Sequence, residues 1–415
     1  MSVGRIVSAR LWFAVVVACV PAVAAGPSED KALASRLAPH VGRALDVVAL
    51  TSGKRLMRPM LDGVTETNGA VKALRLKLDG EKKVTVIPIK GVTEIIAARE
   101  SVYKVEMKAS GAAQLRGKAA RKPQEKEAAA SVERMKANGV SPWPSLSAEE
   151  HAAEVEKLRT FIAEVKELFP GLVSSETHEF LVLTDIPAAQ MAPYVARLDV
   201  MHDFLCDLYG IPRGEPVWKG KCLVVAFLNE ADFHAFEGKF FGVDPSTILA
   251  NVHGLCHSSG DGRVVMACHR GEDAPAFAHM LVHETSHGFN HRWLSTQTVP
   301  NWLNEGIAEW VGTQVVPGCD QVPLKEARAL AYIQQNGSLG PDFFEAANIE
   351  SIQYGMASAL VKFLVSRDRK RFARFVRGIK EGKSVDESLA DSFEASLDEV
   401  LAAFGKAIGK PDLKK

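Results

Sequence analysis

The sequence has no excess of either charge. Its 50 Lys and Arg residues balance its 50 Asp and Glu residues over a chain of 415 residues. This balance argues against a nucleic-acid binder and against a polybasic membrane surface. With 47% hydrophobic and 24% charged residues, the composition is that of an ordinary globular protein, long enough for two or three domains.

Cysteine is scarce, and no two cysteines have the CxxC spacing of a cysteine zinc site. Five of the six cysteines follow the first 25 residues: Cys206, Cys222, Cys256, Cys268 and Cys319. Because five is odd, at least one must stay unpaired. Cys256 and Cys268 flank the predicted turn HSSGDGR and are the first candidate pair, while buried free thiols are the alternative for all five.

Long apolar runs are missing everywhere except at the N-terminus. There, two arginines precede an apolar run from Leu11 to Val20, and small residues follow up to Ala25. This pattern predicts a signal peptide over residues 1–25 and a protein that is exported to the periplasm or the medium. The alternatives are a membrane anchor, for which the run is short, and lipid attachment at Cys19. We expect no stable membrane span after cleavage.

The rest of the chain changes character twice. Residues 28–108 alternate in short stretches punctuated by Gly, Asn and Asp, which predicts a small β-rich domain of four or five strands and unknown role. Residues 109–146 are rich in Ala, Lys and Glu and predict a linker or a solvated helix. Residues 147–415 mix strands with long helices, so this part is predicted to be α+β, with a small sheet followed by a helical subdomain.

Several elements of residues 147–415 have clear boundaries. Ser147 is the N-cap of a predicted helix, and a second helix is predicted over about 188–209, ended by Gly210. The stretches HEFLVLTDI, KCLVVAFL and GRVVMAC predict strands, with a further helix near 230–241. GRVVMAC is predicted to be an edge strand that holds an extended peptide by backbone hydrogen bonds.

The next predicted helix, over about 275–292, carries histidines at 279, 283, 287 and 291. Residues four apart share one helix face, so His283 and His287 can direct two imidazoles at one ion. Glu284 is offset by about 100° and can stand beside the ion without binding it. This is the HExxH arrangement of a zinc site with a carboxylate base. His279 and His291 are predicted to bind no ion and to be either partly exposed or placed behind the ligands.

The stretch NWLNEGIAEW follows, with Glu305 and Glu309 four residues apart. HExxH followed by this stretch resembles the gluzincin zinc peptidases, which include thermolysin-like and aminopeptidase-like families. Over residues 147–380 the chain resembles the small bacterial peptidase MA-like domain and its zincin-like fold. The resemblance implies that Glu305 is the third zinc ligand and that Glu309 accepts the spare N–H of His283. It also implies that Tyr354, in the apolar helix of SIQYGMASALVKFLV, donates its O–H to the oxyanion of the transition state; a buried Tyr with a local hydrogen bond is the alternative.

The sequence therefore predicts an exported Zn²⁺-dependent metallopeptidase that acts on a peptide or protein substrate. In this hypothesis zinc lowers the pKa of its bound water from about 15.7 towards about 7. Glu284 accepts the proton of that water and passes it to the leaving amine. The chain lacks the Gly-x-Met-Glu-Asn motif of the aminopeptidases, which favours an endopeptidase. Two other classes stay open: a catalytically silent zincin-fold binding or scaffold protein, and a zinc amidase acting on cell-wall peptides.

Overall fold

The structure is a computed structural model of the chain. It describes residues 33–45, 47–50, 55–57, 59–67, 70–78, 83–97, 100–107, 113–115, 121–212, 215–244, 246, 252–316 and 318–415. The predicted signal peptide lies outside these residues. The chain divides into two compact units, Met1–Ala119 and Ala120–Lys415, and as a whole it is an α+β protein, as predicted.

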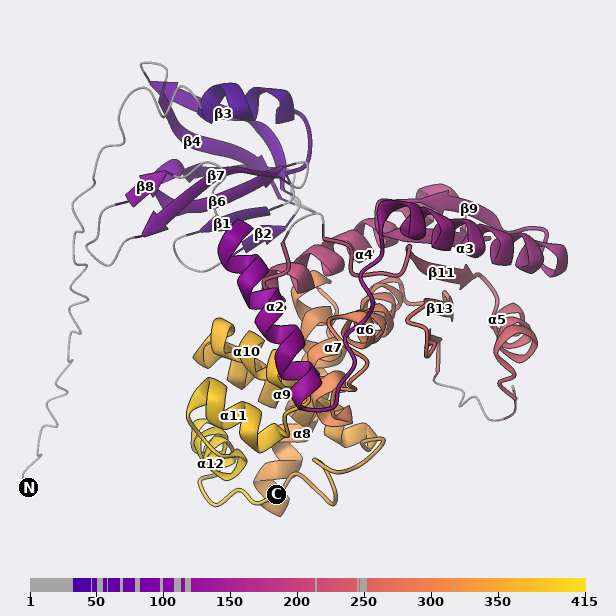
Figure 1. The fold of residues 1–415 in the computed structure, drawn as a ribbon, viewed down its shortest axis with the longest axis vertical. Coiled ribbons are helices and arrows are strands. Elements are labelled where there is room, and N and C mark those ends of the chain that lie inside the picture. Colours follow the sequence, from indigo (N-terminus) through magenta and orange to yellow (C-terminus); the bar gives the residue numbers. More distant parts are fainter. Residues whose placement is uncertain are drawn as a thin grey trace, which may run out of the picture. The chain divides into compact units, whose positions relative to one another are not determined.

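The first unit contains two antiparallel sheets around its own apolar core (Figure 1). Its described elements are η1 (Ala38–His40), β1 (Val47–Leu50), β2 (Arg55–Met57), β3 (Met60–Thr67), β4 (Ala70–Lys77), β5 (Val84–Pro88), η2 (Ile89–Gly91), β6 (Val92–Ala97), β7 (Glu100–Met107) and β8 (Ala113–Leu115). The sheet orders are β2-β1-β6-β7-β8 and β3-β4-β5. Within residues 28–108 the structure has the strands β1 to β7, so the predicted count of four or five was too low. A strand of three residues such as β2 is too short for alternation to reveal.

The second unit begins with α2 (Arg121–Ala137), within the range that was predicted to be a linker or a solvated helix. Ser131 and Met135 of this helix are buried, so it is not solvated on all sides. Arg134 makes two hydrogen bonds to the carboxylate of Glu381, with Nε–Oε2 and Nη2–Oε1 distances of 2.6 and 2.9 Å. The helix is therefore part of the second unit.

A five-stranded sheet of order β12-β13-β11-β10-β9 forms the first half of the second unit. Its elements are α3 (Ala148–Leu168), β9 (Val173–Glu176), β10 (Phe180–Thr184), α4 (Ala188–Tyr209), β11 (Cys222–Phe227), α5 (Glu230–Phe236), the π-helix η3 (Glu237–Phe241), β12 (Gly254–Ser258) and β13 (Val264–His269). β10, β11 and β13 are parallel, and the edge strands β9 and β12 run antiparallel to them. In Figure 1, α3 lies along this sheet, and its apolar residues share one core with α5.

Local sequence explains the ends of these helices. Ser147 is the N-cap of α3, as predicted: its hydroxyl accepts a hydrogen bond from the backbone N–H of Glu150, and the Glu150 carboxylate accepts one from the N–H of Ser147, which makes a capping box. α4 ends at Gly210, whose φ of 70° lies in the left-handed region that glycine adopts without strain. Both predicted boundaries are confirmed.

Helices form the rest of the chain: α6 (Ala274–Arg292), α7 (Asn301–Val315), α8 (Gln321–Asn336), α9 (Ser351–Arg367), α10 (Arg369–Lys380), α11 (Val385–Phe393) and α12 (Leu397–Ala407). α6 covers the face of the sheet opposite α3, and α7 packs on both α6 and α9. Among the described residues, no helix combines the length and the apolar composition that a membrane span requires.

GRVVMAC forms a strand, as predicted, but this strand is not at the edge of the sheet. β13 pairs with β11 on one side and with β12 on the other, so it is an interior strand. The edge strand on this side is β12, which pairs antiparallel with β13. A short strand with one free edge is harder to recognise than the buried, strongly apolar strand beside it.

All five described cysteines are free thiols. The register of β12 and β13 places Cys256 opposite Met266 and Cys268 opposite Gly254, so the candidate pair does not face each other across the ladder. The alternative of free thiols therefore holds for all five, and four of them are buried, while Cys256 is partly exposed.

Candidate metal centre

Two imidazoles of α6 point at the same place. The Nε2 atoms of His283 and His287 lie 3.1 Å apart, and the two rings are perpendicular. Asp273 is the N-cap of this helix, and its carboxylate accepts a hydrogen bond from the N–H of Ala276. Pro275 lies in the first turn. These signals set the start of the helix, and the four-residue spacing then places both histidines on one face.

Glu305 of α7 completes a group of three. Its Oε2 lies 3.1 Å from Nε2 of His283 and 3.3 Å from Nε2 of His287. A tetrahedral ion with bonds of about 2.0–2.1 Å separates its ligand atoms by about 3.3 Å. The three atoms are therefore spaced as the ligands of one small cation would be. We call His283, His287 and Glu305 the ligand cluster.

The ligand cluster is electrostatically coupled. Burial raises the pKa of Glu305, but hydrogen bonds to the two imidazoles outweigh it and hold that pKa well below its usual range. Burial lowers the pKa of His287, while the hydrogen bond and the charge of Glu305 outweigh burial and raise it to about 9. A cation that binds between these three side chains must therefore displace a proton from His287 near pH 7.

Glu284 lies beside the ligand cluster. A carboxylate oxygen of Glu284 is within 4.8 Å of ring nitrogens of both His283 and His287. Burial raises its pKa, and the neighbouring imidazoles partly oppose that change. A carboxylate with a raised pKa next to a metal position is suited to accept and return a proton.

Glu309 lies on the far side of His283. Its Oε1 is 3.8 Å from Nδ1 of His283, which is too long for a hydrogen bond, and this Nδ1 has no hydrogen-bond partner among the described residues. The same Oε1 is paired with the ammonium of Lys325 from α8. Glu309 and His283 are thus neighbours, as predicted, but the Glu309 carboxylate accepts its hydrogen bond from Lys325 and not from His283.

His279 has the second of the two positions expected for it, behind the ligands and not at the surface. It is buried, and its Nε2 lies 3.5 Å from Oε2 of Glu309. Gly312 makes room for the ring, because a Cβ on that glycine would lie 2.4 Å from it. Burial and the nearby His283 lower the pKa of His279 to about 4, so the ring is neutral near pH 7. His279 and Lys325 were both missed as neighbours of Glu309, and no local pattern marks them.

His291 and Tyr354 lie outside the ligand cluster. His291 contacts Trp143, with ring centroids 5.5 Å apart, and is not part of the ligand cluster. Tyr354 of α9 is half-buried, and the Lys325 ammonium lies 5.6 Å from its ring centre. Burial raises the pKa of Tyr354, and the charge of Glu305 raises it further. Its hydroxyl is therefore within electrostatic range of the ligand cluster.

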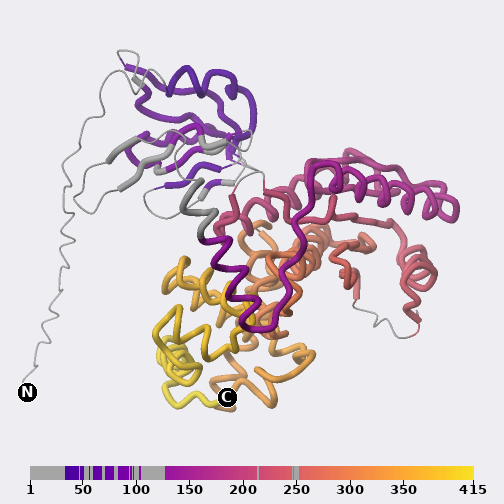
Figure 2. The backbone as a smooth tube through the Cα atoms, in the orientation of Figure 1, coloured from indigo at the N-terminus to yellow at the C-terminus, as the bar shows by residue number. Residues whose placement is uncertain are grey.

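A buried lysine of α10 holds the connection between α6 and α7. Nζ of Lys380 donates to the backbone carbonyls of His291, Ser295 and Gln297 at 3.2, 2.9 and 2.6 Å. The chain turns back after α2 (Figure 2), and Trp143, which follows this helix in the sequence, donates to the carbonyl of His291 from its indole N–H at 3.1 Å. Because the ligands come from both helices, fixing this connection fixes their relative position.

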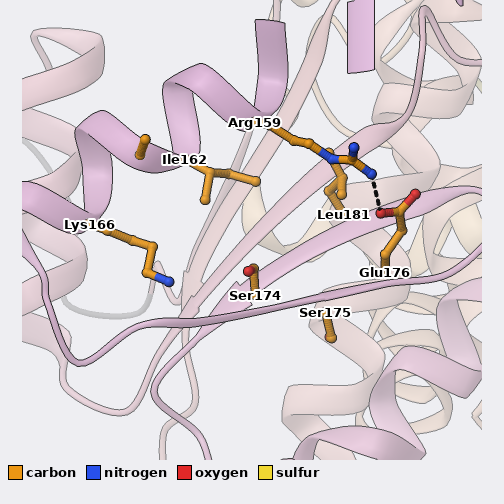
Figure 3. A pocket seen from close by; sticks show the side chains of 8 residues that line it. Arg159, Ile162, Lys166, Ser174, Ser175, Glu176 and Leu181 are labelled. Carbon is orange, nitrogen blue, oxygen red and sulfur yellow. Dashed lines mark hydrogen bonds and ion pairs between the residues drawn. The ribbon is translucent and has the colours of Figure 1, made fainter. Parts of the chain in front are cut away.

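A cavity of about 450 Å³ lies elsewhere, between α3 and β9 (Figure 3). Arg159 and Glu176 form an ion pair at its edge, with a distance of 2.7 Å. None of the predicted site residues lines it.

No protein-family model matches the chain, and no curated protein matches it. The geometry and chemistry of the site carry the functional argument.

Proposed function

We propose that this protein is an exported, zinc-dependent endopeptidase of the gluzincin type. The observation that carries the proposal is the ligand cluster: two imidazole nitrogens and one carboxylate oxygen, from two helices, with mutual distances of 3.1–3.3 Å. Two histidines and one carboxylate are a ligand set of catalytic zinc sites, in which the fourth position stays open for water or substrate.

The residues around the cluster have roles that fit peptide hydrolysis. A zinc ion bound there would supply a water of lowered pKa and an electrophile for the scissile carbonyl. Glu284 accepts the proton of the attacking water and returns it to the leaving amine. The Tyr354 hydroxyl donates to the oxyanion. Glu309 and Lys325 form an ion pair behind His283 and fix the carboxylate beside that ring.

The edge strand β12 offers a place for the substrate. It packs on α6, the helix of the HExxH motif, and its outer edge carries the backbone groups of Gly254–Ser258 that β13 does not use. An extended peptide can add to such an edge by main-chain hydrogen bonds. This arrangement favours an endopeptidase over an enzyme that needs a chain terminus.

The decisive variant is Glu284→Gln, which keeps the shape of the side chain and removes the base. We expect zinc binding to persist and hydrolysis to fall by about 100-fold or more. Glu272→Gln, at an exposed acid near the start of α6, is the matched control and should keep full activity. Digests of a peptide library and of peptidoglycan, run side by side, separate a peptidase from a cell-wall amidase. If Glu284→Gln retains every activity of the wild type, catalysis by this site is refuted and a scaffold role is favoured.

A further inference from the structure

Three buried polar atoms behind the ligand cluster face one another without a hydrogen bond. They are Nε2 of His279, Nδ1 of His283 and Oε2 of Glu309, and none of them has a hydrogen-bond partner among the described residues. All three residues are buried. A buried polar atom without a partner is costly, so three such atoms in one place indicate a bound group that satisfies them together.

The spacing of these atoms fits one small molecule. Nε2 of His279 lies 3.5 Å from Oε2 of Glu309, and Nδ1 of His283 lies 3.8 Å from the other oxygen of the same carboxylate. One nitrogen of each ring and one carboxylate oxygen lie within 4.8 Å of one another. Three atoms at such separations can all lie about 2.8 Å from a single oxygen atom, which is a hydrogen-bond distance.

The neighbouring residues keep these three atoms in place. The Lys325 ammonium is bonded to Oε1 of Glu309, which holds the carboxylate in an orientation that does not reach Nδ1 of His283. On α7, Gly312 leaves room for the His279 ring, because a Cβ there would lie 2.4 Å from its Cδ2 and Nε2 atoms. The ring centroids of His279 and His283 are 5.9 Å apart, so the two rings do not stack.

We propose that these three atoms bind one buried water molecule, and that His279 thereby acts as a positioning residue for the proposed zinc ligand His283. When Nε2 of His283 binds the ion, the proton of the neutral ring is on Nδ1, which donates to the water. The water in turn donates to the Glu309 carboxylate. With its second proton or its second lone pair it pairs with Nε2 of His279, in either tautomer of that ring. Three polar partners are the usual number for a buried water.

The water would fix the orientation of His283 in place of a direct bond to a carboxylate. A hydrogen bond from the second nitrogen of a metal-bound imidazole holds the ring and raises its basicity. This role of His279 rests on the proposed function, because it requires zinc at the ligand cluster. Two imidazoles and a carboxylate would also suit a second metal ion, but the Lys325 ammonium beside Glu309 repels another cation.

Two substitutions of His279 distinguish this role from packing. His279→Gln keeps a polar group near the position of Nε2, whereas His279→Phe keeps a ring and removes both nitrogens. We expect zinc affinity, measured by competition with a chelator, to fall about tenfold in His279→Phe and to stay within about threefold of the wild type in His279→Gln. His291→Phe, at a histidine that contacts Trp143, is the matched control and should bind zinc like the wild type. The proposal is overturned if His279→Phe binds zinc at least as tightly as His279→Gln, which is the order that packing alone would give.

A high-resolution crystal structure of the zinc-loaded full-length chain tests the water directly. We expect an electron-density peak about 2.7–3.1 Å from the three atoms, without anomalous signal at the zinc edge. An anomalous peak there would identify a second zinc ion, and the lack of any peak would remove the link between His279 and His283; either result overturns the proposal. Failure of the proposed function looks different, because His283→Ala would then bind zinc as tightly as the wild type. The unfolding temperature of each metal-free variant checks that it is folded.

Discussion

Gly306 allows α7 and α9 to approach closely enough to share one site. A Cβ at this position would lie 2.5 Å from the carbonyl oxygen of Ala357 and 2.8 Å from a methyl group of Val361. Ordinary carbon contacts are about 3.5 Å, so Gly306→Ala must push the helices apart by roughly 1 Å. Overpacking of this kind costs about 1–3 kcal/mol, against about 1 kcal/mol that alanine gains in helix propensity.

The displacement matters more for the metal than for the fold. Glu305 precedes Gly306, and metal ligands must hold their positions to about 0.2 Å. We therefore expect Gly306→Ala to lose at most about 2 kcal/mol of unfolding free energy and to lower zinc affinity by about 10–100-fold. Urea unfolding and zinc competition with a chelator measure the two effects. Gly171→Ala is the control, because a Cβ there meets no atom within 4 Å. Wild-type zinc affinity in Gly306→Ala would refute the reasoning.

Three further predictions concern protons and hydrogen bonds. The interaction with Glu305 outweighs the effect of burial and raises the pKa of His287 to about 9, so below that pH zinc must displace a proton to bind. Zinc affinity, measured by calorimetry, should therefore rise about tenfold per pH unit up to pH 9. A zinc affinity that does not change with pH would contradict this. Lys380→Met removes the donor that the backbone carbonyls of His291, Ser295 and Gln297 share. It should lower the free energy of unfolding, measured in urea, by about 3 kcal/mol. Tyr354→Phe should lower kcat about 100-fold with little change in KM; an unchanged kcat would exclude its hydroxyl from the reaction.

Local signals allowed much of the second unit to be predicted. The bounds of α4 follow from an apolar pattern that ends at Gly210, and the approach of His283 and His287 follows from helix geometry alone. Glu305 is different, because its position depends on how α7 packs on α6. Only the resemblance to gluzincins pointed to it, and the structure places it 3.1 Å from His283.

The contacts that could not be predicted join residues that lie far apart in the sequence. Lys325 reaches Glu309 from another helix, and no spacing rule connects the two. His279 follows the same four-residue ladder as the ligands, yet it faces Glu309 and the space left by Gly312 instead of the cluster. The position of β12 outside β13 also depends on strand pairing, which an apolar pattern does not encode.

The central claim is that His283, His287 and Glu305 bind one zinc ion. The most direct measurement is an anomalous-difference map, collected at the zinc absorption edge from crystals of the wild-type protein grown with Zn²⁺. The account predicts a peak about 2.0–2.2 Å from Nε2 of both histidines and from the Glu305 carboxylate. A map with no peak between these three side chains would contradict it.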